Sequence, residues 1–382
     1  MRVYDTLAQK VIDILTENGF KAYYVGGCVR DTLMNKKPTD YDLCTDALPD
    51  ETMECLKEFS VIKTGIKHGT VTALVDSSPI EITTLRCDGS YSDHRRPDKV
   101  LYTKDLSEDL KRRDFTVNAM AYGYEKLFDY FGGADDILNK IIKCVGNAEK
   151  RFNEDALRIM RALRFASTLG FTIEEKTSAA IRRNKYLLSD IAAERIFKEF
   201  SKLVISDYAA YILEEYNEVF SVIFPFEIHI ENLTNMPHDP AVRFAALFED
   251  NTFSACKILK TSNNFLRESC FIADHLKDKT YSRREVKLLL CENSVQSVKK
   301  LLEINGECLE TLFDILKNNE CFSLNTLAVN GNDLIKLGIE NSNIGRILHE
   351  LLLYVIDNSS MNEHNILIKK AIDLSKKRNF VI

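Results

Sequence analysis

The spacing of hydrophobic and polar residues changes once along the chain, near residue 147. Before that point, short runs rich in β-branched and aromatic residues alternate with glycine-containing turns, at residues 22–25, 71–75, 80–85 and 141–145. Such runs are typical of a small sheet flanked by helices. From about residue 148 onward the apolar residues recur at helical spacing. The pattern predicts an α+β fold, with a sheet-containing N-terminal part followed by an all-α remainder.

Helix-end signals divide the second part further. Asn147 is expected to cap its first helix, and Gly170 is expected to end the helix that follows. Pro225, Pro237 and Pro240 interrupt the helical pattern and predict a join near residues 221–240. A chain of 382 residues exceeds one compact core, so two to four domains are expected.

Composition narrows the class of protein. Hydrophobic residues make up 45% of the chain and charged residues 28%, as in ordinary soluble proteins. The ten cysteines show no CxxC spacing and no histidine partners at zinc-site intervals, which favours free thiols in a reducing cytosol. No export signal and no run of about 20 apolar residues is recognisable, so a cytoplasmic protein without membrane contact is predicted.

The net charge of −6 does not argue against nucleic-acid binding, because binding depends on where the positive charge lies. Residues 147–202 contain twelve basic and eight acidic residues, a local balance of +4. A basic segment therefore lies inside an acidic chain.

A glycine turn and an aspartate pair near the N-terminus suggest nucleotidyl transfer. Gly26 and Gly27 allow backbone N–H groups to approach a triphosphate closely, and Arg30 adds a charged fork for phosphate oxygens. Asp40 and Asp42 have the spacing of one strand face, from which two carboxylates could hold a shared pair of Mg²⁺ ions. Glycine pairs and DxD pairs are each common in loops, so the order and close spacing of these residues carry the prediction.

Glu81 is a candidate third carboxylate. Alternation within residues 80–84 places it on the strand face opposite Ile80 and Ile82. It is equally well explained as a solvated residue of a half-exposed strand.

A dense set of polar donors follows at residues 111–120, and it is predicted to enter an apolar helix. Arg112, Asp114 and Asn118 are candidate nucleotide-binding residues, which would contact triphosphate oxygens and ribose hydroxyls. Asp114 and Asn118 stand at i and i+4. This spacing favours joint action on a helix over the simpler interpretation, a solvated pair formed by Arg112 and Arg113.

A second candidate helix, residues 151–164, carries a carboxylate and three arginines spaced by three. They are Asp155, Arg158, Arg161 and Arg164. Asp155 can accept from the exocyclic amine of cytosine or adenine while Arg158 donates to the neighbouring ring acceptor, so that uracil or guanine would leave buried polar groups unpaired. Seen alone, the segment would be interpreted as an amphipathic helix with salt bridges.

The polar loop at residues 86–98 is rich in charge and turn-forming residues. Such loops are usually linkers, although a loop that changes shape can also serve a site.

In this order the sequence resembles class II tRNA nucleotidyltransferases, the bacterial CCA-adding enzymes and their poly(A) polymerase relatives. The resemblance covers almost the whole chain. The family's motifs A to E correspond to residues 26–42, 112–119, 128–133, 154–164 and 193–200, and residues 327–334 resemble the start of its tail segment. Tyr130 stands in motif C where many members carry proline.

The resemblance implies how these residues act. Asp40 and Asp42 are expected to bind metal, and nucleotide contacts are expected from Gly27, Arg30, Arg112, Asp155, Arg158, Arg161 and Arg164. The implied architecture is a nucleotidyltransferase head at residues 1–147, a neck at 148–205 that selects the base, and a body at 206–320 and a tail at 321–382 that bind tRNA.

The implied reaction is template-independent addition of CCA to tRNA. The 3′-hydroxyl of the acceptor end would attack the α-phosphorus of CTP, and then of ATP, with Mg²⁺ as cofactor and pyrophosphate as leaving group. The partners are then the tRNA acceptor arm and 3′ end, CTP and ATP, and neither DNA nor a membrane.

Several other functions compete with this one. CC-only members have a shortened flexible loop, whereas residues 88–100 are intact here, so full CCA addition is favoured. A-adding enzymes and poly(A) polymerases keep the same motifs and stay open as alternatives. A non-catalytic RNA-binding protein is disfavoured by the intact aspartates and arginines.

Overall fold

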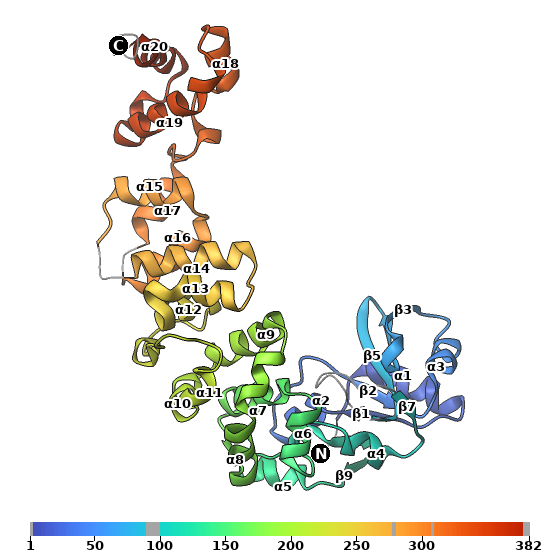
Figure 1. Cartoon of the computed structure of the whole chain (residues 1–382). Helices are drawn as coiled ribbons and strands as arrows, with labels where there is room; N and C mark the ends of the chain where they lie inside the picture. Colours follow the sequence, from blue (N-terminus) through green and yellow to red (C-terminus); the bar gives the residue numbers. More distant parts are fainter. Residues whose placement is uncertain (1–2, 89–99, 277–279, 307–308, 377–382) are drawn as a thin grey trace. The chain divides into compact units, whose positions relative to one another are not determined.

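The computed structural model describes residues 3–88, 100–276, 280–306 and 309–376 (Figure 1). The chain forms two compact units, one made of Met1–Ile230 and Lys257–Lys260 and the other of Glu231–Cys256 and Thr261–Ile382. The division falls within the proline-containing segment at residues 221–240. The four-part division into head, neck, body and tail stays a prediction, and residues 89–98 of the polar loop lie outside the described residues.

A mixed seven-stranded sheet forms the centre of the first unit, in the order β3-β4-β5-β2-β1-β8-β9. Its strands are β1 Ala22–Val25, β2 Leu43–Thr45, β3 Ser60–Gly65, β4 Thr70–Val75, β5 Ser78–Thr84, β8 Met120–Gly123 and β9 Lys126–Asp129. Within this sheet β2 and β5 pair in parallel, and the other neighbours pair antiparallel. The predicted runs at residues 22–25, 71–75 and 80–85 correspond to β1, β4 and β5.

Two small sheets lie beside the large one. β6 Arg86–Asp88 pairs antiparallel with β7 Val100–Tyr102, and β10 Ile141–Ile142 pairs in parallel with β11 Thr172–Ile173. The run at residues 141–145 does contain a strand, at residues 141–142, but this strand lies outside the central sheet. Its partner strand, β11, lies among the later helices of the chain.

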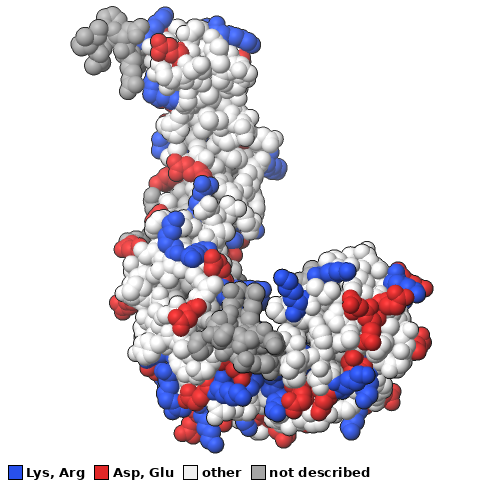
Figure 2. Space-filling model, turned by 45° about the vertical axis from the view of Figure 1, so that its right-hand side comes forward, with Lys and Arg blue, Asp and Glu red and all other residues white. Residues whose placement is uncertain are grey.

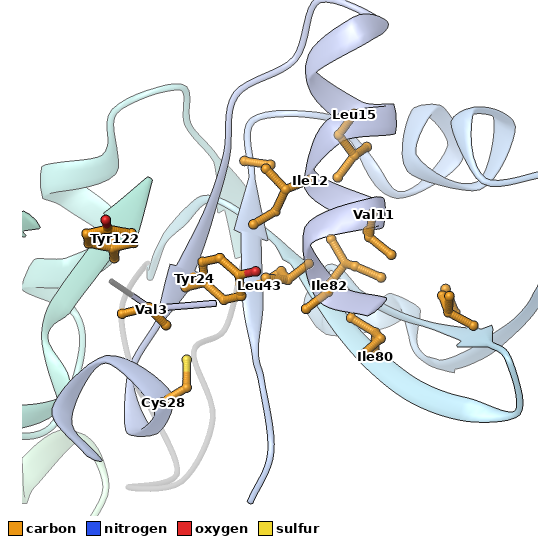
Figure 3. Close-up of a cluster of buried hydrophobic side chains, with 14 of the residues drawn as sticks. Val3, Val11, Ile12, Leu15, Tyr24, Cys28, Leu43, Ile80, Ile82 and Tyr122 are labelled. Carbon is orange, nitrogen blue, oxygen red and sulfur yellow. The ribbon is translucent and has the colours of Figure 1, made fainter. Parts of the chain in front are cut away.

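Side chains of the central sheet alternate between two buried layers. On one face, Tyr24, Leu43 and Ile82 pack with Val11 and Leu15 of α1 (Figure 3). On the other face, a smaller cluster packs against α4. Because both faces of β1 are covered, all four of its residues are buried, and the strand reads as a continuous apolar run.

Helices cover the central sheet, and they also make up most of the first unit after β9. They are α1 Thr6–Glu17, α2 Gly27–Leu33, α3 Pro49–Cys55, α4 Leu106–Lys111, α5 Gly133–Leu138, α6 Ala148–Glu154, α7 Leu157–Leu169, α8 Glu175–Asn184, α9 Ala193–Val204, α10 Ala209–Glu215 and α11 Asn217–Phe220. Both predicted helix ends are confirmed. The Asn147 side chain accepts from the Lys150 N–H at 2.9 Å, and Gly170 follows α7 with a φ of 68°.

The described part of the second unit is helical. It contains α12 Pro240–Phe248, most of α13 Thr252–Ile258, α14 Asn263–His275, α15 Arg283–Glu292, α16 Val295–Ile304, α17 Glu310–Lys317, α18 Gly331–Lys336, α19 Asn341–Asp357 and α20 His364–Lys376. One core joins α12, α14, α15 and α16, and another joins α18, α19 and α20. Between them, the buried Lys287 of α15 pairs with Glu320 and donates to Ser359 Oγ at 2.7 Å. The predicted α+β class is confirmed.

None of the helices that the structure describes is long and apolar enough to cross a membrane.

Gly133, the first residue of α5, marks a close approach of two backbone segments. A Cβ at this position would lie 2.2 Å from the carbonyl oxygen of Thr116, far inside van der Waals contact. Thr116 begins the short 3-10 helix Thr116–Asn118, which carries one of the candidate site residues. Packing of α5 therefore sets the position of that turn.

We expect Gly133→Ala to lower the free energy of unfolding by about 2–3 kcal/mol, because the added methyl group must displace backbone. Urea unfolding followed by far-UV circular dichroism measures this, since the chain contains no tryptophan. Gly345→Ala is the matched control, because a Cβ at this helical glycine of α19 has no neighbour within 4 Å. Equal losses in both variants would contradict the close-approach argument.

Candidate active site

The glycine turn lies between β1 and α2 and needs glycine at its first position. Gly26 has φ 76° and ψ −126°, a conformation that residues with a Cβ rarely adopt. A Cβ there would also lie 3.2 Å from Nη1 of Arg113. The Val25 N–H donates to the Asp42 carbonyl at 3.0 Å, so the turn and the aspartate segment are neighbours.

Asp40 and Asp42 are both exposed and lie immediately before β2, which begins at Leu43. The prediction that they share one strand face is wrong in detail, because the chain here is not yet paired as a strand. Alternation nevertheless holds, since Tyr41 packs on Tyr24 of the opposite layer, with ring centroids 6.0 Å apart.

Glu81 lies in β5, beside the segment that carries the two aspartates. Leu43 pairs with Ile82, and this parallel register makes Glu81 the neighbour of Asp42 on the face away from the Ile82 core. Partial desolvation raises the pKa of the Asp42 carboxyl, and the negative charges of Glu81 and Asp40 raise it further, while Arg113 opposes them.

These carboxylates suit a hard divalent cation, because their oxygens are the ligands that such ions prefer. Desolvation is the main cause of the raised pKa of Asp42, and the repulsion by Glu81 and Asp40 that adds to it is what a cation would relieve. Within the described ranges, however, no three Asp, Glu, His or Cys side chains converge closely enough to hold a metal ion by themselves. A cation here would need further oxygen ligands, such as phosphate or water.

Asp109 of α4 holds two arginines in place. It is fully buried and pairs with Arg112 at 2.8 Å and with Arg113 at 3.3 Å. Burial raises the pKa of Asp109, but Arg113 and Arg112 outweigh burial and leave the pKa below its usual value. Arg112 is therefore held by Asp109. The simpler interpretation, in which Arg112 and Arg113 form a solvated pair, required it to be free in solvent.

Asp114 and Asn118 come together, but not on a helix. α4 ends at Lys111, and Asn118 lies in the 3-10 helix Thr116–Asn118 just before β8, so the predicted apolar helix is wrong. Asn118 Nδ2 still donates to Asp114 Oδ1 at 3.4 Å, and Arg30 Nη1 donates to Asn118 Oδ1 at 2.6 Å. The tight turn, rather than helical spacing, brings these three residues together.

Asp114 also binds an arginine of α7. Arg161 reaches the Asp114 carboxylate with Nε at 2.7 Å and Nη2 at 2.6 Å, while the Phe115 N–H donates to Asp114 at 2.8 Å. Burial raises the pKa of Asp114, but the charges of Arg161 and Arg158 and these hydrogen bonds lower it to about 2. Glu199 of α9 extends the series by binding Arg164.

The predicted base-reading pair has separate partners in the structure. Asp155 lies between α6 and α7 rather than on a helix, and it pairs with Arg195 at 3.1 Å. Arg158 is 8% exposed and binds Glu154 at 2.8 Å and the Arg112 carbonyl at 3.1 Å. The helix from residue 157 does carry Arg158, Arg161 and Arg164, as predicted.

Charge in the basic segment is largely compensated. All seven arginines between residues 147 and 202 form ion pairs with Asp or Glu, namely Arg151, Arg158, Arg161, Arg164, Arg182, Arg183 and Arg195. Figure 2 accordingly shows acidic side chains intermixed with basic ones on the visible face. The local balance of +4 therefore does not form a bare positive surface.

Sequence reasoning did not select four residues that the structure places at this network. Arg113 and Glu154 adjoin selected residues, whereas Arg195 and Glu199 lie in the segment aligned with motif E. The only hint in the sequence was that a further charged residue stands close to a selected residue or motif. Pairing across about 40 residues of sequence cannot be read from spacing alone.

Comparisons with known proteins cover nearly the whole chain. Residues 22–143 match the family model described as "Poly A polymerase head domain", and residues 170–226 match "Probable RNA and SrmB-binding site of polymerase A". The CCA-adding enzyme of Pediococcus pentosaceus is 35% identical over 97% of this chain and 98% of that enzyme.

Other relatives differ in how much they cover. The CCA-adding enzyme of Lactobacillus delbrueckii subsp. bulgaricus is 52% identical, but the match spans 52% of this chain and 50% of that enzyme. The crystal structure of the Bacillus stearothermophilus CCA-adding enzyme in complex with CTP is 30% identical, with a TM-score of 0.79 and coverage of 99% of both chains.

The depressed pKa of Asp114 predicts a loss of stability in acid. Its contribution is fully present above the ordinary pKa of 3.8 and is lost as the pH falls towards 2. Between pH 6 and pH 3, we expect the stability gap between wild type and Asp114→Asn to shrink by about 1 kcal/mol. Urea unfolding by circular dichroism at both pH values measures the gap. Asp135→Asn, at an exposed carboxylate of α5, is the control, and a gap for Asp114→Asn that does not change with pH would contradict the assignment.

Proposed function

The chain belongs to the family of CCA-adding enzymes, and from this relationship we propose that it adds CCA to tRNA 3′ ends from CTP and ATP. The addition is template-independent and releases pyrophosphate. The observation that carries the proposal is the match to a CCA-adding enzyme over nearly the full length of both chains. The aspartates beside the glycine turn support the same chemistry from the chain's own residues.

Asp40 and Asp42 are proposed to hold the divalent cation, for which Mg²⁺ is our assignment. When bound, such an ion neutralises the triphosphate and favours ionisation of the attacking hydroxyl. Support comes from the exposed carboxylates and from the raised pKa of Asp42. Glu81 is proposed as a third catalytic carboxylate. Its negative charge raises the pKa of Asp42, and the pairing of Leu43 with Ile82 makes Glu81 the neighbour of Asp42.

The triphosphate is proposed to lie against the turn that contains Gly26 and Gly27. Arg30 and Arg112 would bind its oxygens, because each guanidinium is already oriented by a carboxylate, at Asp31 and Asp109 respectively. Preorganised donors neutralise the charge that gathers on the leaving pyrophosphate without having to reorient during the reaction. Asp114 and Asn118 are proposed to contact the nucleotide or to orient Arg30 and Arg161.

Base selection is proposed for Asp155, Arg158, Arg161 and Arg164. Asp155 would accept from the exocyclic amine that cytosine and adenine share, while an arginine donates to the ring acceptor beside it. Arg195 adds support, because its Nη1 is buried without a hydrogen-bond partner among the described residues and lies on the guanidinium that binds Asp155. A bound base would replace hydrogen bonds between these protein side chains with hydrogen bonds to the base itself.

The proposed partner is tRNA, held by its acceptor arm through backbone and shape rather than base sequence. A cytoplasmic location is also proposed, and it is supported by cysteines that are free wherever the structure describes them. DNA and membranes are not expected partners.

A second activity is favoured by one observation. The model that matches residues 22–143 is named for the head of poly(A) polymerase, so addition of adenylate alone is the alternative. The two activities differ in the nucleotide that the first addition requires.

We expect tRNA that ends before the first C to gain two residues with CTP alone and three with CTP and ATP together. The products are resolved by denaturing gel electrophoresis after incubation with Mg²⁺. A matched tRNA that already ends in CCA should gain none. Extension of the shortened tRNA by ATP alone would support the adenylate-adding alternative instead.

Asp42→Ala is expected to reduce incorporation of both CMP and AMP by roughly 1,000-fold or more, because it removes a carboxylate from the cation site. Circular dichroism should show an unchanged fold, since Asp42 is exposed. Asp50→Ala, an exposed acidic residue in the first turn of α3, should retain normal activity. Near-normal incorporation by Asp42→Ala would sink the catalytic assignment.

A further inference from the structure

The ring of Phe165 lies among three arginines that come from different parts of the first unit. Its centroid is 3.7 Å from the guanidinium carbon of Arg164, and 5.3 Å from those of both Arg30 and Arg161. Arg30 belongs to α2 beside the sheet, whereas Arg161 and Arg164 belong to α7. All three distances fall within about 6 Å, the range of attraction between a cation and an aromatic face.

Carboxylates, rather than the ring, compensate the positive charges of the three guanidinium groups. Arg30 pairs with Asp31, Arg161 with Asp114 and Arg164 with Glu199. Glu199 also lies 3.8 Å from Arg161, but none of these three carboxylates pairs with all three arginines. The ring is the feature that the three arginines share.

Phe165 is itself held firmly. It is 7% exposed, and it meets the fully buried Phe115 edge to face, with ring centroids 5.8 Å apart at 78°. Phe115 directly follows Asp114, the carboxylate that binds Arg161. The ring is therefore part of the packed contact between the sheet-bearing segment and α7, and its position is not free to adjust.

We propose that Phe165 is a positioning residue for nucleotide binding, which orients the guanidinium groups of Arg30, Arg161 and Arg164 before CTP or ATP arrives. This inference rests on the proposed function, in which these arginines contact the nucleotide. The electron-rich face of the ring attracts all three cations, while the pairing of each guanidinium with a negatively charged carboxylate limits their mutual repulsion. An aliphatic side chain of similar volume would fill the same space without this attraction.

The test is a comparison of Phe165→Leu and Phe165→Met with wild type. Both should raise the KM for CTP and for ATP by roughly five- to thirty-fold, the loss expected when one or two partly buried cation–aromatic contacts are removed. The kcat should change by less than about twofold, and the KM for tRNA should stay unchanged, because orientation is restored once the nucleotide is bound. A rise in the KM for tRNA together with those for CTP and ATP would indicate general misfolding and overturn the proposal.

Phe165→Tyr should restore the wild-type KM for both nucleotides, since it keeps the aromatic face. Phe220→Leu is the matched control, because Phe220 is also buried in the same unit but its ring packs on Phe200. It should lower the thermal unfolding midpoint while leaving the KM values unchanged. Equal KM values in wild type and in either folded aliphatic variant would refute the positioning role.

Failure of the underlying function is distinguishable from failure of this inference. If wild type does not extend the shortened tRNA, the proposed function fails before any variant is compared. Calorimetric titration of CTP without tRNA gives a second readout, in which Phe165→Leu should bind more weakly by the same factor. Unchanged CTP affinity in an active protein would overturn the role of Phe165 alone.

Discussion

The ion pair between Asp114 and Arg161 joins the sheet-bearing part of the first unit to the helices that follow. Asp114 is buried between α4 and β8, and Arg161 reaches it from α7, 47 residues later. A carboxylate in such a place is tolerated only when it is paired and hydrogen-bonded, because an unpaired buried charge is strongly destabilising. The geometry around Asp114 therefore constrains where α7 can lie.

Polar contacts spread from this pair in both directions. On one side they run through Asn118 to Arg30, and on the other through Glu199 to Arg164. From Asp114 to Arg164 acidic and basic groups alternate, and Arg30 pairs with Asp31, so each charge is compensated by a neighbour in a region of low dielectric. Residues from the glycine turn and from α7 are thereby held in one arrangement before any nucleotide binds.

This arrangement bears on the base selection that we propose for Asp155 and Arg158. Selection by amino acids requires donors and acceptors that do not rearrange to suit the wrong base, because adaptable groups discriminate poorly. Asp155 paired with Arg195 and Arg158 paired with Glu154 are restrained in this sense. The same pairing explains why a segment rich in arginine carries little free positive charge.

Local chemistry in the sequence determined much of this protein. The apolar runs predicted β1, β4 and β5, and the cap at Asn147 and the helix end at Gly170 were correct. The glycine turn and the aspartates predicted nucleotidyl transfer. These features depend on neighbouring residues, whose preferences are written in short stretches of chain. Tertiary structure alone decided which charges pair. Asp155 met Arg195 rather than Arg158, Asp114 and Asn118 met in a 3-10 turn rather than on a helix, and three arginines converged on Phe165, because packing brings together groups that lie far apart in sequence.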